Sequence, residues 1–224
     1  LRQALAGIAR ENADVPSSGL YTAAKGLVPE GLTVDGLDYR ETAGDPLPTI
    51  SEPKALYLAA RQGMATSDFS GVTLLLPKSA GLTELADQIN SAWQKECSLF
   101  FSVEEVEQDE FDARIAAGKY TIALAPIRAE GGSVYQMLQQ FTTAGGSLTG
   151  YADTVYADRL ALSAQQTGKA RCDLLAQCEQ QLLESCTVVP LMAQQKRLLL
   201  ANGVRDLVFD PFFPVLDLTW AKMS

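Results

Sequence analysis

The residues best suited to hold a ligand follow an apolar run at positions 120–125 and combine opposite charges with two adjacent glycines. They are Ile127, Arg128, Ala129, Glu130, Gly131, Gly132 and Ser133. In open parallel sheets ligands bind off the carboxyl ends of the strands, and this segment would lie there if the apolar run is a strand. Ser can also cap a following helix. An ordinary strand-to-helix loop has the same composition, so the residues alone leave both interpretations open.

The sequence contains one motif known from nucleophilic catalysis, S-x-x-K, formed by Ser51 and Lys54. In serine acyl enzymes such a Lys lies one helical turn from the Ser and takes its proton, but the partner motifs S-D-N and K-T-G are absent. Ser51 precedes Pro53, which instead predicts that Ser51 is the N-cap of a helix. The chain contains no His, so His-dependent triads and His-ligated zinc are excluded. An enzyme would have to use carboxylates, Lys, Tyr or Cys.

The four cysteines, at positions 97, 172, 178 and 186, contain no CxxC pair, and we expect no metal and no cofactor. Within a helix over residues 169–186, Cys172 and Cys178 would lie ~9 Å apart along the axis, and Cys178 and Cys186 ~12 Å apart. A disulfide needs Cα atoms within about 7 Å. We predict that Cys178 is a buried thiol. Cys186, near the helix end, is the best candidate for a disulfide.

The charge balance argues against several classes of partner. There are 18 Lys and Arg residues against 27 Asp and Glu, a formal net charge of −9, and the cations are scattered. Nucleic acid and anionic membrane surfaces both need clustered cations. An acidic run over residues 104–112 lacks the ligand pattern of an EF-hand and predicts a solvated helix N-terminus. No apolar run approaches the roughly 20 residues of a membrane helix, so we expect no direct membrane insertion.

Hydrophobic periodicity predicts the elements that would position the glycine-rich segment. Strands and helices alternate in the middle of the chain, which predicts an α/β fold with a mainly parallel sheet flanked by helices. The expected strands span residues 72–76, 98–103, 120–125, 187–192 and 197–201. The expected helices span residues 1–10, 51–64, 82–93, 111–116, 134–141, 154–165 and 169–186. Residues 12–48, rich in Gly and Pro, are expected to form a long ordered loop.

Short motifs in this order resemble the second half of the extracytoplasmic solute-binding proteins of peptide ABC transporters, the oligopeptide and dipeptide binding family. The matching stretches are Leu1-Arg2-Gln3-Ala4-Leu5 with Ile8-Ala9-Arg10, Val28-Pro29-Glu30-Gly31, residues 72–76 with 86–93, Phe111-x-x-Arg114 with Gly118-x-Tyr120, residues 151–160, and Cys178-Glu179 with Val189-Pro190-Leu191. The family's W-x-A-D-Y-x-D-P segment falls on residues 127–133. There Ala129 matches, Glu130 replaces the Asp that receives a peptide's terminal amine in some members, and the Trp and D-P are missing.

The resemblance implies a periplasmic-binding-protein-like lobe over residues 1–224, in which about residues 187–224 include the return segment toward a first lobe. It implies a monomeric, extracytoplasmic protein, periplasmic or anchored as a lipoprotein through a segment outside this chain. Such a protein captures peptides or similar small solutes and delivers them to the membrane subunits of an ABC permease, and the resemblance therefore implies that the protein is not an enzyme. Residues 127–133 and Tyr151 would bind the ligand. The alternative is the sensor lobe of a solute-responsive transcriptional regulator with the same fold.

Overall fold

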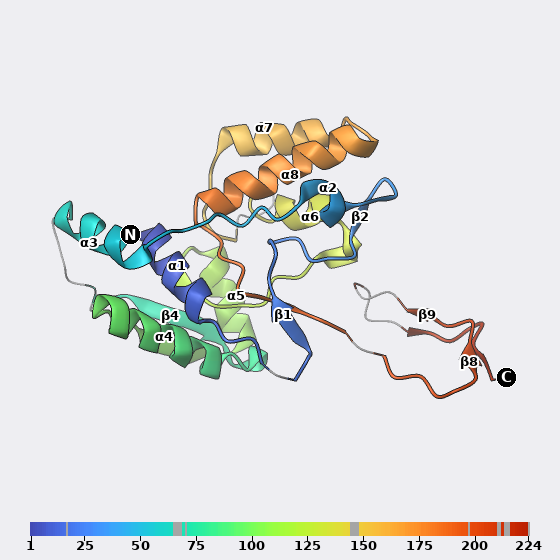
Figure 1. Cartoon of the computed structure of the whole chain (residues 1–224), viewed down its shortest axis with the longest axis horizontal. Coiled ribbons are helices and arrows are strands. Elements are labelled where there is room, and N and C mark those ends of the chain that lie inside the picture. Colours follow the sequence, from blue (N-terminus) through green and yellow to red (C-terminus); the bar gives the residue numbers. More distant parts are fainter. Residues whose placement is uncertain are drawn as a thin grey trace.

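The computed structural model describes residues 1–16, 18–64, 69, 71–143, 148–196, 198–209, 212 and 216–223, and for Glu130, Phe209, Asp217 and Met223 it describes the backbone only. It confirms an α/β fold in which helices flank a parallel sheet (Figure 1). Helices α2, α6, α7 and α8 gather on one side, and α1, α3 and α4 lie together near the sheet. The C-terminal strands lie at the opposite end of the molecule from α3.

The central strand of the sheet is β4 (Thr73–Pro77), with β5 (Ser102–Val106) and β6 (Ile122–Ala123) on either side. Both neighbours run parallel to β4, and Leu74 is opposite Val103 on one side and Ile122 on the other. Because β4 is covered on both faces, its sequence is a continuous apolar run rather than an alternation. The predicted parallel sheet is therefore confirmed for these three strands.

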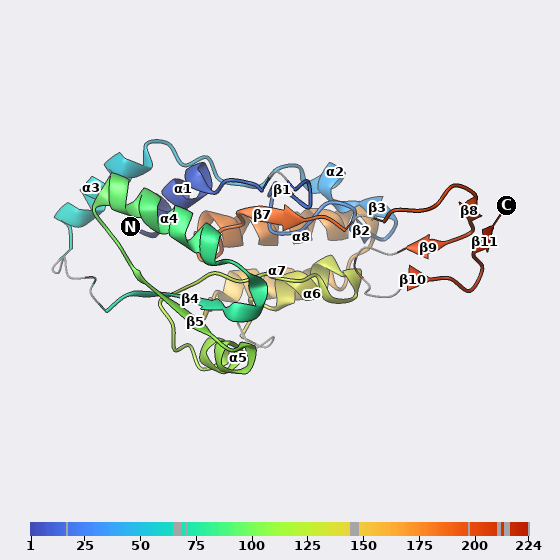
Figure 2. The same cartoon turned by 90° about the horizontal axis from the view of Figure 1, so that it is seen from below.

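The two faces of the sheet are covered by different helices, because successive side chains of a strand point to opposite faces. Leu74 and Leu76 belong to a core shared with α1 (Arg2–Asn12), α3 (Pro53–Gln62) and α4 (Thr83–Cys97). Leu75 packs on the other face with Val106 and Phe111, which belongs to α5 (Gln108–Ala116). Figure 2 shows α4 and α5 on opposite sides of the strands.

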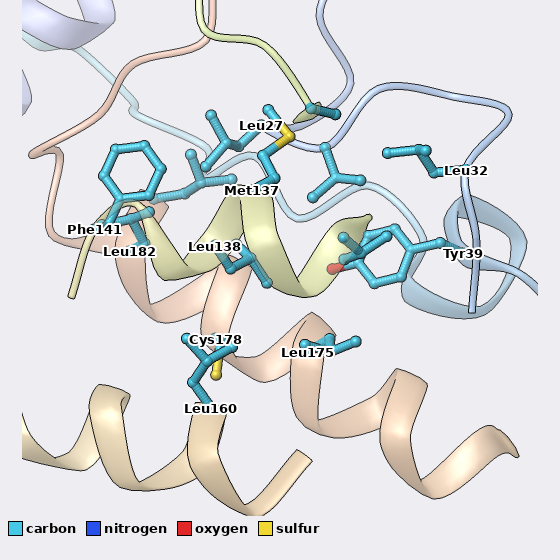
Figure 3. Close-up of a cluster of buried hydrophobic side chains, with 14 of the residues drawn as sticks. Leu27, Leu32, Tyr39, Met137, Leu138, Phe141, Leu160, Leu175, Cys178 and Leu182 are labelled. Carbon is cyan, nitrogen blue, oxygen red and sulfur yellow. The ribbon is translucent and has the colours of Figure 1, made fainter. Parts of the chain in front are cut away.

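A second core lies between α2 (Tyr39–Ala43), α6 (Val134–Gln139), α7 (Thr154–Ser163) and α8 (Gly168–Glu184). Leu138, Leu160, Leu175 and Leu182 fill its centre, and Leu27 and Leu32 close it from the loop before α2 (Figure 3). The predicted helices over residues 134–141, 154–165 and 169–186 are confirmed within a few residues.

Short antiparallel strands connect the two cores and form the C-terminal end. Strand β1 (Tyr21–Ala23) pairs with β7 (Met192–Gln194), and β2 (Thr33–Val34) pairs with β3 (Leu37–Asp38). Strands β8 (Val204–Arg205) and β11 (Lys222–Met223) form one pair, and β9 (Val208–Phe209) and β10 (Leu216–Asp217) form another. We call strands β8 to β11 the C-terminal arm, which projects beyond the helices in Figure 2.

The predicted start of the second strand is wrong, because β5 begins at Ser102 rather than at residue 98. Leu99 and Phe101 are buried, but as a connection rather than as a strand. The side-chain amide of Asn90 donates to the Phe101 carbonyl at 2.6 Å and accepts from its N–H at 3.0 Å, which replaces a strand partner. Consequently Glu104 lies in β5, and only the later part of the acidic run forms the predicted helix start.

Four other expectations are wrong. The loop over residues 12–48 contains the short elements β1, β2, β3 and α2. Glu52, not Ser51, is the N-cap of α3; it makes no side-chain capping hydrogen bond, and Pro53 occupies the first helical position. The predicted strand at residues 187–192 is replaced by β7, which begins at Met192 and pairs with β1. Residues 198–201 are not a strand, and Arg197 lies outside the described residues.

All four cysteines are free thiols and buried, so the prediction for Cys178 is confirmed and a disulfide at Cys186 is wrong. Cys178 is fully buried on α8, and burial raises the pKa of its thiol to about 12. Cys186 is only 4% exposed and lies in a turn after α8, where burial also raises its pKa. A raised pKa keeps each thiol protonated and unreactive.

Among the helices in the described part of the chain, none combines the length and the apolar character needed to cross a bilayer.

Candidate functional site

The carboxyl ends of the three parallel strands meet at one edge of the sheet. After β4 and β5 the polar groups at this edge bind one another. The Lys78 Nζ atom lies 2.7 Å from a Glu107 carboxylate oxygen, and the Ser79 hydroxyl donates to the Gln108 side-chain oxygen at 2.7 Å. After β6 the backbone continues without regular structure as far as residue 129, and residues 126–128 are exposed. All four of these side chains are exposed, but they are paired with one another, whereas the exposed residues after β6 are not part of these pairs.

Hydrogen bonds and packing hold the backbone on both sides of the exposed residues Ile127 and Arg128. Before these residues, the Leu124 N–H donates to the Leu75 carbonyl at 2.8 Å, which extends the sheet by one bond. Further on, the Arg128 carbonyl accepts from the Gln140 side chain at 3.2 Å, and Ala129 is buried in the second core. Ile127 and the Arg128 side chain remain exposed between these points. A ligand would meet a short, preformed stretch of backbone with one apolar and one cationic side chain.

Two consecutive glycines turn the chain from this stretch into α6. Gly131 and Gly132 have φ values of 60° and 65°, a left-handed conformation that residues with a Cβ adopt at a cost. The Ser133 hydroxyl then accepts from the Gln136 N–H at 3.3 Å and caps α6, as the sequence predicts. Glu130 lies in the 3₁₀ turn Glu130–Gly132, and its side chain lies outside the described residues. That its carboxylate faces a ligand stays a prediction.

Residues from two distant parts of the chain lie against this turn. A Cβ placed on Gly132 would lie 3.6 Å from the Phe212 Cβ atom and 3.7 Å from a Leu32 methyl carbon. Leu32 belongs to the loop before α2, and half-buried Phe212 belongs to the chain between β9 and β10. Phe212, between the second and third strands of the C-terminal arm, therefore lies beside the candidate ligand segment.

Tyr151 lies at the junction of α7 and α8. Its ring packs edge-on against Tyr156, with centroids 5.5 Å apart, and its hydroxyl is 3.3 Å from an Asp153 carboxylate oxygen. The Gln181 side chain of α8 donates to the same hydroxyl at 3.4 Å. Burial, and then the negative charge of Asp153, raise the pKa of Tyr151. These contacts give Tyr151 a packing role, and its contact with a ligand stays a prediction.

A buried charge network, missed by the sequence analysis, fixes the loop that carries Leu32. The fully buried Glu179 carboxylate of α8 accepts from the Arg40 guanidinium at 2.9 Å, from the Tyr39 hydroxyl at 2.8 Å and from the Val28 N–H at 2.9 Å. Arg40 also donates to the Val28 carbonyl at 2.5 Å. Both polar backbone groups of Val28 are thereby held by a single ion pair.

Gly26 makes room for this network. A Cβ at Gly26 would lie 2.6 Å from a Glu179 carboxylate oxygen and 2.8 Å from an Arg40 nitrogen, closer than any ordinary contact. Burial and the Glu179 charge raise the pKa of Tyr39, which therefore remains a hydrogen-bond donor. The sequence showed Val28 and Glu179 only as parts of two separate motifs, because 151 residues separate them.

Within the described residues, no group of three or more Cys, Asp or Glu side chains is arranged to hold a metal ion.

No family model and no curated protein sequence matches the chain. Solved structures do match it in three dimensions. The pheromone receptor PrgZ, solved with its mode of peptide binding, is 16% identical with a TM-score of 0.74, covering 100% of this chain and 44% of that one. Listeria monocytogenes OppA bound to peptide is 18% identical with a TM-score of 0.70 over 100% of this chain and 44% of that one.

A peptide-binding protein of a peptide ABC transporter is 16% identical with a TM-score of 0.67, and the match covers 85% of this chain and 90% of that one. This chain thus spans less than half the length of PrgZ and of the Listeria protein, but most of the length of this third structure. At these identities the likeness concerns the fold. The chain has the periplasmic-binding-protein-like fold found in the corresponding part of oligopeptide-binding proteins, as its sequence predicts.

Proposed function

We propose that the chain is the ligand-binding lobe of an extracytoplasmic solute-binding protein that captures peptides or similar small solutes and delivers them to an ABC permease. The observation that carries the proposal is the position of residues 127–133. In a fold shared with peptide-binding proteins, this segment follows a strand at the carboxyl edge of a parallel sheet and carries exposed side chains, and ligands bind at this edge in folds of this class. Its role is binding rather than catalysis.

The ligand contacts follow from the exposed groups of the segment. Ile127 offers an apolar surface and Arg128 a positive charge, while the turn at Gly131 and Gly132 brings backbone close to any bound molecule. We assign Glu130 to the terminal amine of a peptide, which a carboxylate recognises by a charge-assisted hydrogen bond. Tyr151 supports the site by holding α7 against α8.

A second lobe is the natural cover for the C-terminal arm. Large apolar side chains are exposed in and beside it, among them Leu199 at 98%, Trp220 at 68% and Leu218 at 58%. Isolated two-stranded ribbons are marginally stable in water, and contiguous exposed apolar surface marks an interface. We infer that about residues 187–224 include a segment that returns to another lobe of the same polypeptide, that the whole is a monomer, and that the ligand lies between the lobes.

Calorimetry with a library of short peptides tests the proposal. If two lobes contribute equally to the binding free energy, a peptide bound with a Kd of about 1 μM by the two-lobed protein falls to about 1 mM with this chain alone. Micromolar binding by the isolated chain, equal to that of the two-lobed protein, would contradict the shared cleft. Failure of the two-lobed protein to bind any peptide would contradict peptide capture itself.

A further inference from the structure

A groove of about 620 Å³ opens between α1, the first turns of α3 and the last turn of α4. Volumes of this size are typical of sites that hold a small molecule or a few side chains. Apolar groups line part of it, namely Ile8, Pro53, Ala55 and Leu58. The remaining wall is polar and is made by Glu11, Asn12, Glu52, Lys54 and Glu96. Figure 1 shows α1, α3 and α4 at the opposite end of the molecule from the C-terminal arm.

The groove lies beside a close contact between α1 and the start of α3. A Cβ at Gly7 would lie 2.8 Å from both an Ile50 side-chain carbon and the Pro53 Cβ atom, so glycine is needed for this approach. Ile8 and Glu11 follow Gly7 on α1, where Ile8 is buried at the base of the groove and Glu11 is exposed. Glu52 has a left-handed φ of 49°, a strained conformation for a residue with a side chain. Glu52 lines the groove at the start of α3, and its side chain is exposed.

The rim is acidic. The lining contains three carboxylates, those of Glu11, Glu52 and Glu96, and one ammonium, that of Lys54; with Lys95 beside Glu96 the local charge is −1. Lys54 lies 3.3 Å from Glu96, and Lys95 lies 3.7 Å from the other oxygen of the same carboxylate. Within the described part of the chain, Glu11 and Glu52 form no ion pair, and both are exposed. The uncompensated charge of the rim therefore belongs to these two residues.

Leu58 lies between the acidic groups with 54% of its surface exposed, a large apolar side chain turned outward on α3. An apolar surface flanked by unpaired carboxylates complements an aliphatic side chain flanked by cations. A second copy of this chain, with a net charge of −9, would be repelled, and so would an anionic bilayer. The charge pattern selects a basic partner.

We propose that this groove docks a basic segment of a partner protein, in which Leu or Ile side chains contact Ala55 and Leu58 while Lys or Arg side chains pair with Glu11 and Glu52. The surface is separate from residues 127–133, which follow β6 rather than lining α1, α3 or α4. It can therefore be occupied while a ligand is bound. The proposal does not depend on what that ligand is.

Fluorescence anisotropy tests the proposal with a fluorescein-labelled amphipathic helix of Leu and Lys, acetylated at its N-terminus and amidated at its C-terminus. The blocked ends remove the free amine that Glu130 would recognise. We expect the wild-type protein to bind this peptide and not its Leu–Glu counterpart. The double change Glu11→Gln with Glu52→Gln removes two exposed ion pairs of ordinary strength, so it should reduce the affinity for the Leu–Lys peptide about fivefold. Leu58→Ser also reduces it, and because Leu58 is exposed this change leaves the fold intact.

The matched control is Glu84→Gln with Asp87→Asn, which removes two exposed carboxylates from α4 outside the groove and changes the net charge equally. We expect it to leave the affinity unchanged. An equal loss of affinity in the control would show that the peptide binds by general charge attraction and would overturn the proposal. It would also be overturned by equal binding of the Leu–Glu peptide, by no binding of either peptide, or by self-association of the protein that Leu58→Ser abolishes.

Discussion

Replacing Glu179 by Gln removes the charge from a carboxylate with 0% exposure and keeps its shape. Three donors then face a neutral amide, namely the Arg40 guanidinium, the Tyr39 hydroxyl and the Val28 N–H. Arg40 is 9% exposed and would retain its charge without a carboxylate partner. Breaking a buried ion pair by removing one partner costs about 3–5 kcal/mol of the free energy of unfolding. For a chain of this size, each kcal/mol lowers Tm by about 2–4 °C, so Tm should fall by roughly 6–20 °C.

Urea denaturation followed by the fluorescence of buried Trp93 measures this loss. The matched control is Asp173→Asn, which breaks an exposed ion pair with Lys169 on the same helix and should cost less than about 1 kcal/mol. Because Arg40 and Glu179 share one network, Arg40→Met combined with Glu179→Gln should cost less than the sum of the two single changes by about 0.5–3 kcal/mol. A loss below about 1 kcal/mol for Glu179→Gln, equal to the control, would refute the assigned network.

Three further changes have defined outcomes. Gly26→Ala places a Cβ 2.6 Å from a Glu179 oxygen and should lower the free energy of unfolding by about 1–3 kcal/mol. The control Gly71→Ala, with open space around it, should change the free energy of unfolding little. Equal effects of the two changes in urea denaturation would contradict the close packing at Gly26. The four buried thiols should not react with a thiol reagent at pH 8 in the native protein and should all react after unfolding. The reason is that burial raises the pKa of Cys178 to about 12 and leaves little thiolate. Rapid reaction of Cys178 in the native protein would be inconsistent with its burial. In the two-lobed protein, Glu130→Gln should weaken binding of a free-amine peptide at least about tenfold and leave its acetylated form unchanged in calorimetry, and no change for either peptide would remove Glu130 from amine recognition.

Local patterns in the sequence predict most of the elements. The apolar run at β4, the helical spacing of α4 and the long α8 each arise from neighbouring residues, whose periodicity is visible in one dimension. The candidate ligand segment could also be located, because the carboxyl end of a parallel strand is defined by the order of elements alone. Its Ser133 cap follows from residue type.

Contacts between distant residues could not be predicted in this way. The pairing of Tyr21 with Gln194 depends on how the two cores pack, and neither three-residue strand has a periodic pattern of its own. Arg40 and Glu179 are 139 residues apart and show their relation only in the folded chain. At the start of β5, apolar residues predicted a strand, but the side chain of Asn90 binds both backbone groups of Phe101. One polar side chain thus displaced the strand by several residues.

The central claim, that this lobe contributes to the capture of peptides, is tested most directly by native mass spectrometry of the two-lobed protein purified without denaturation. The bound molecule would then be released and sequenced. We predict one peptide with a free amino terminus per protein molecule, and little or none on this chain alone, because the cleft would lack one of its sides. A bound sugar or other non-peptide solute, or a folded two-lobed protein that carries no ligand and takes up no added peptide, would contradict the claim.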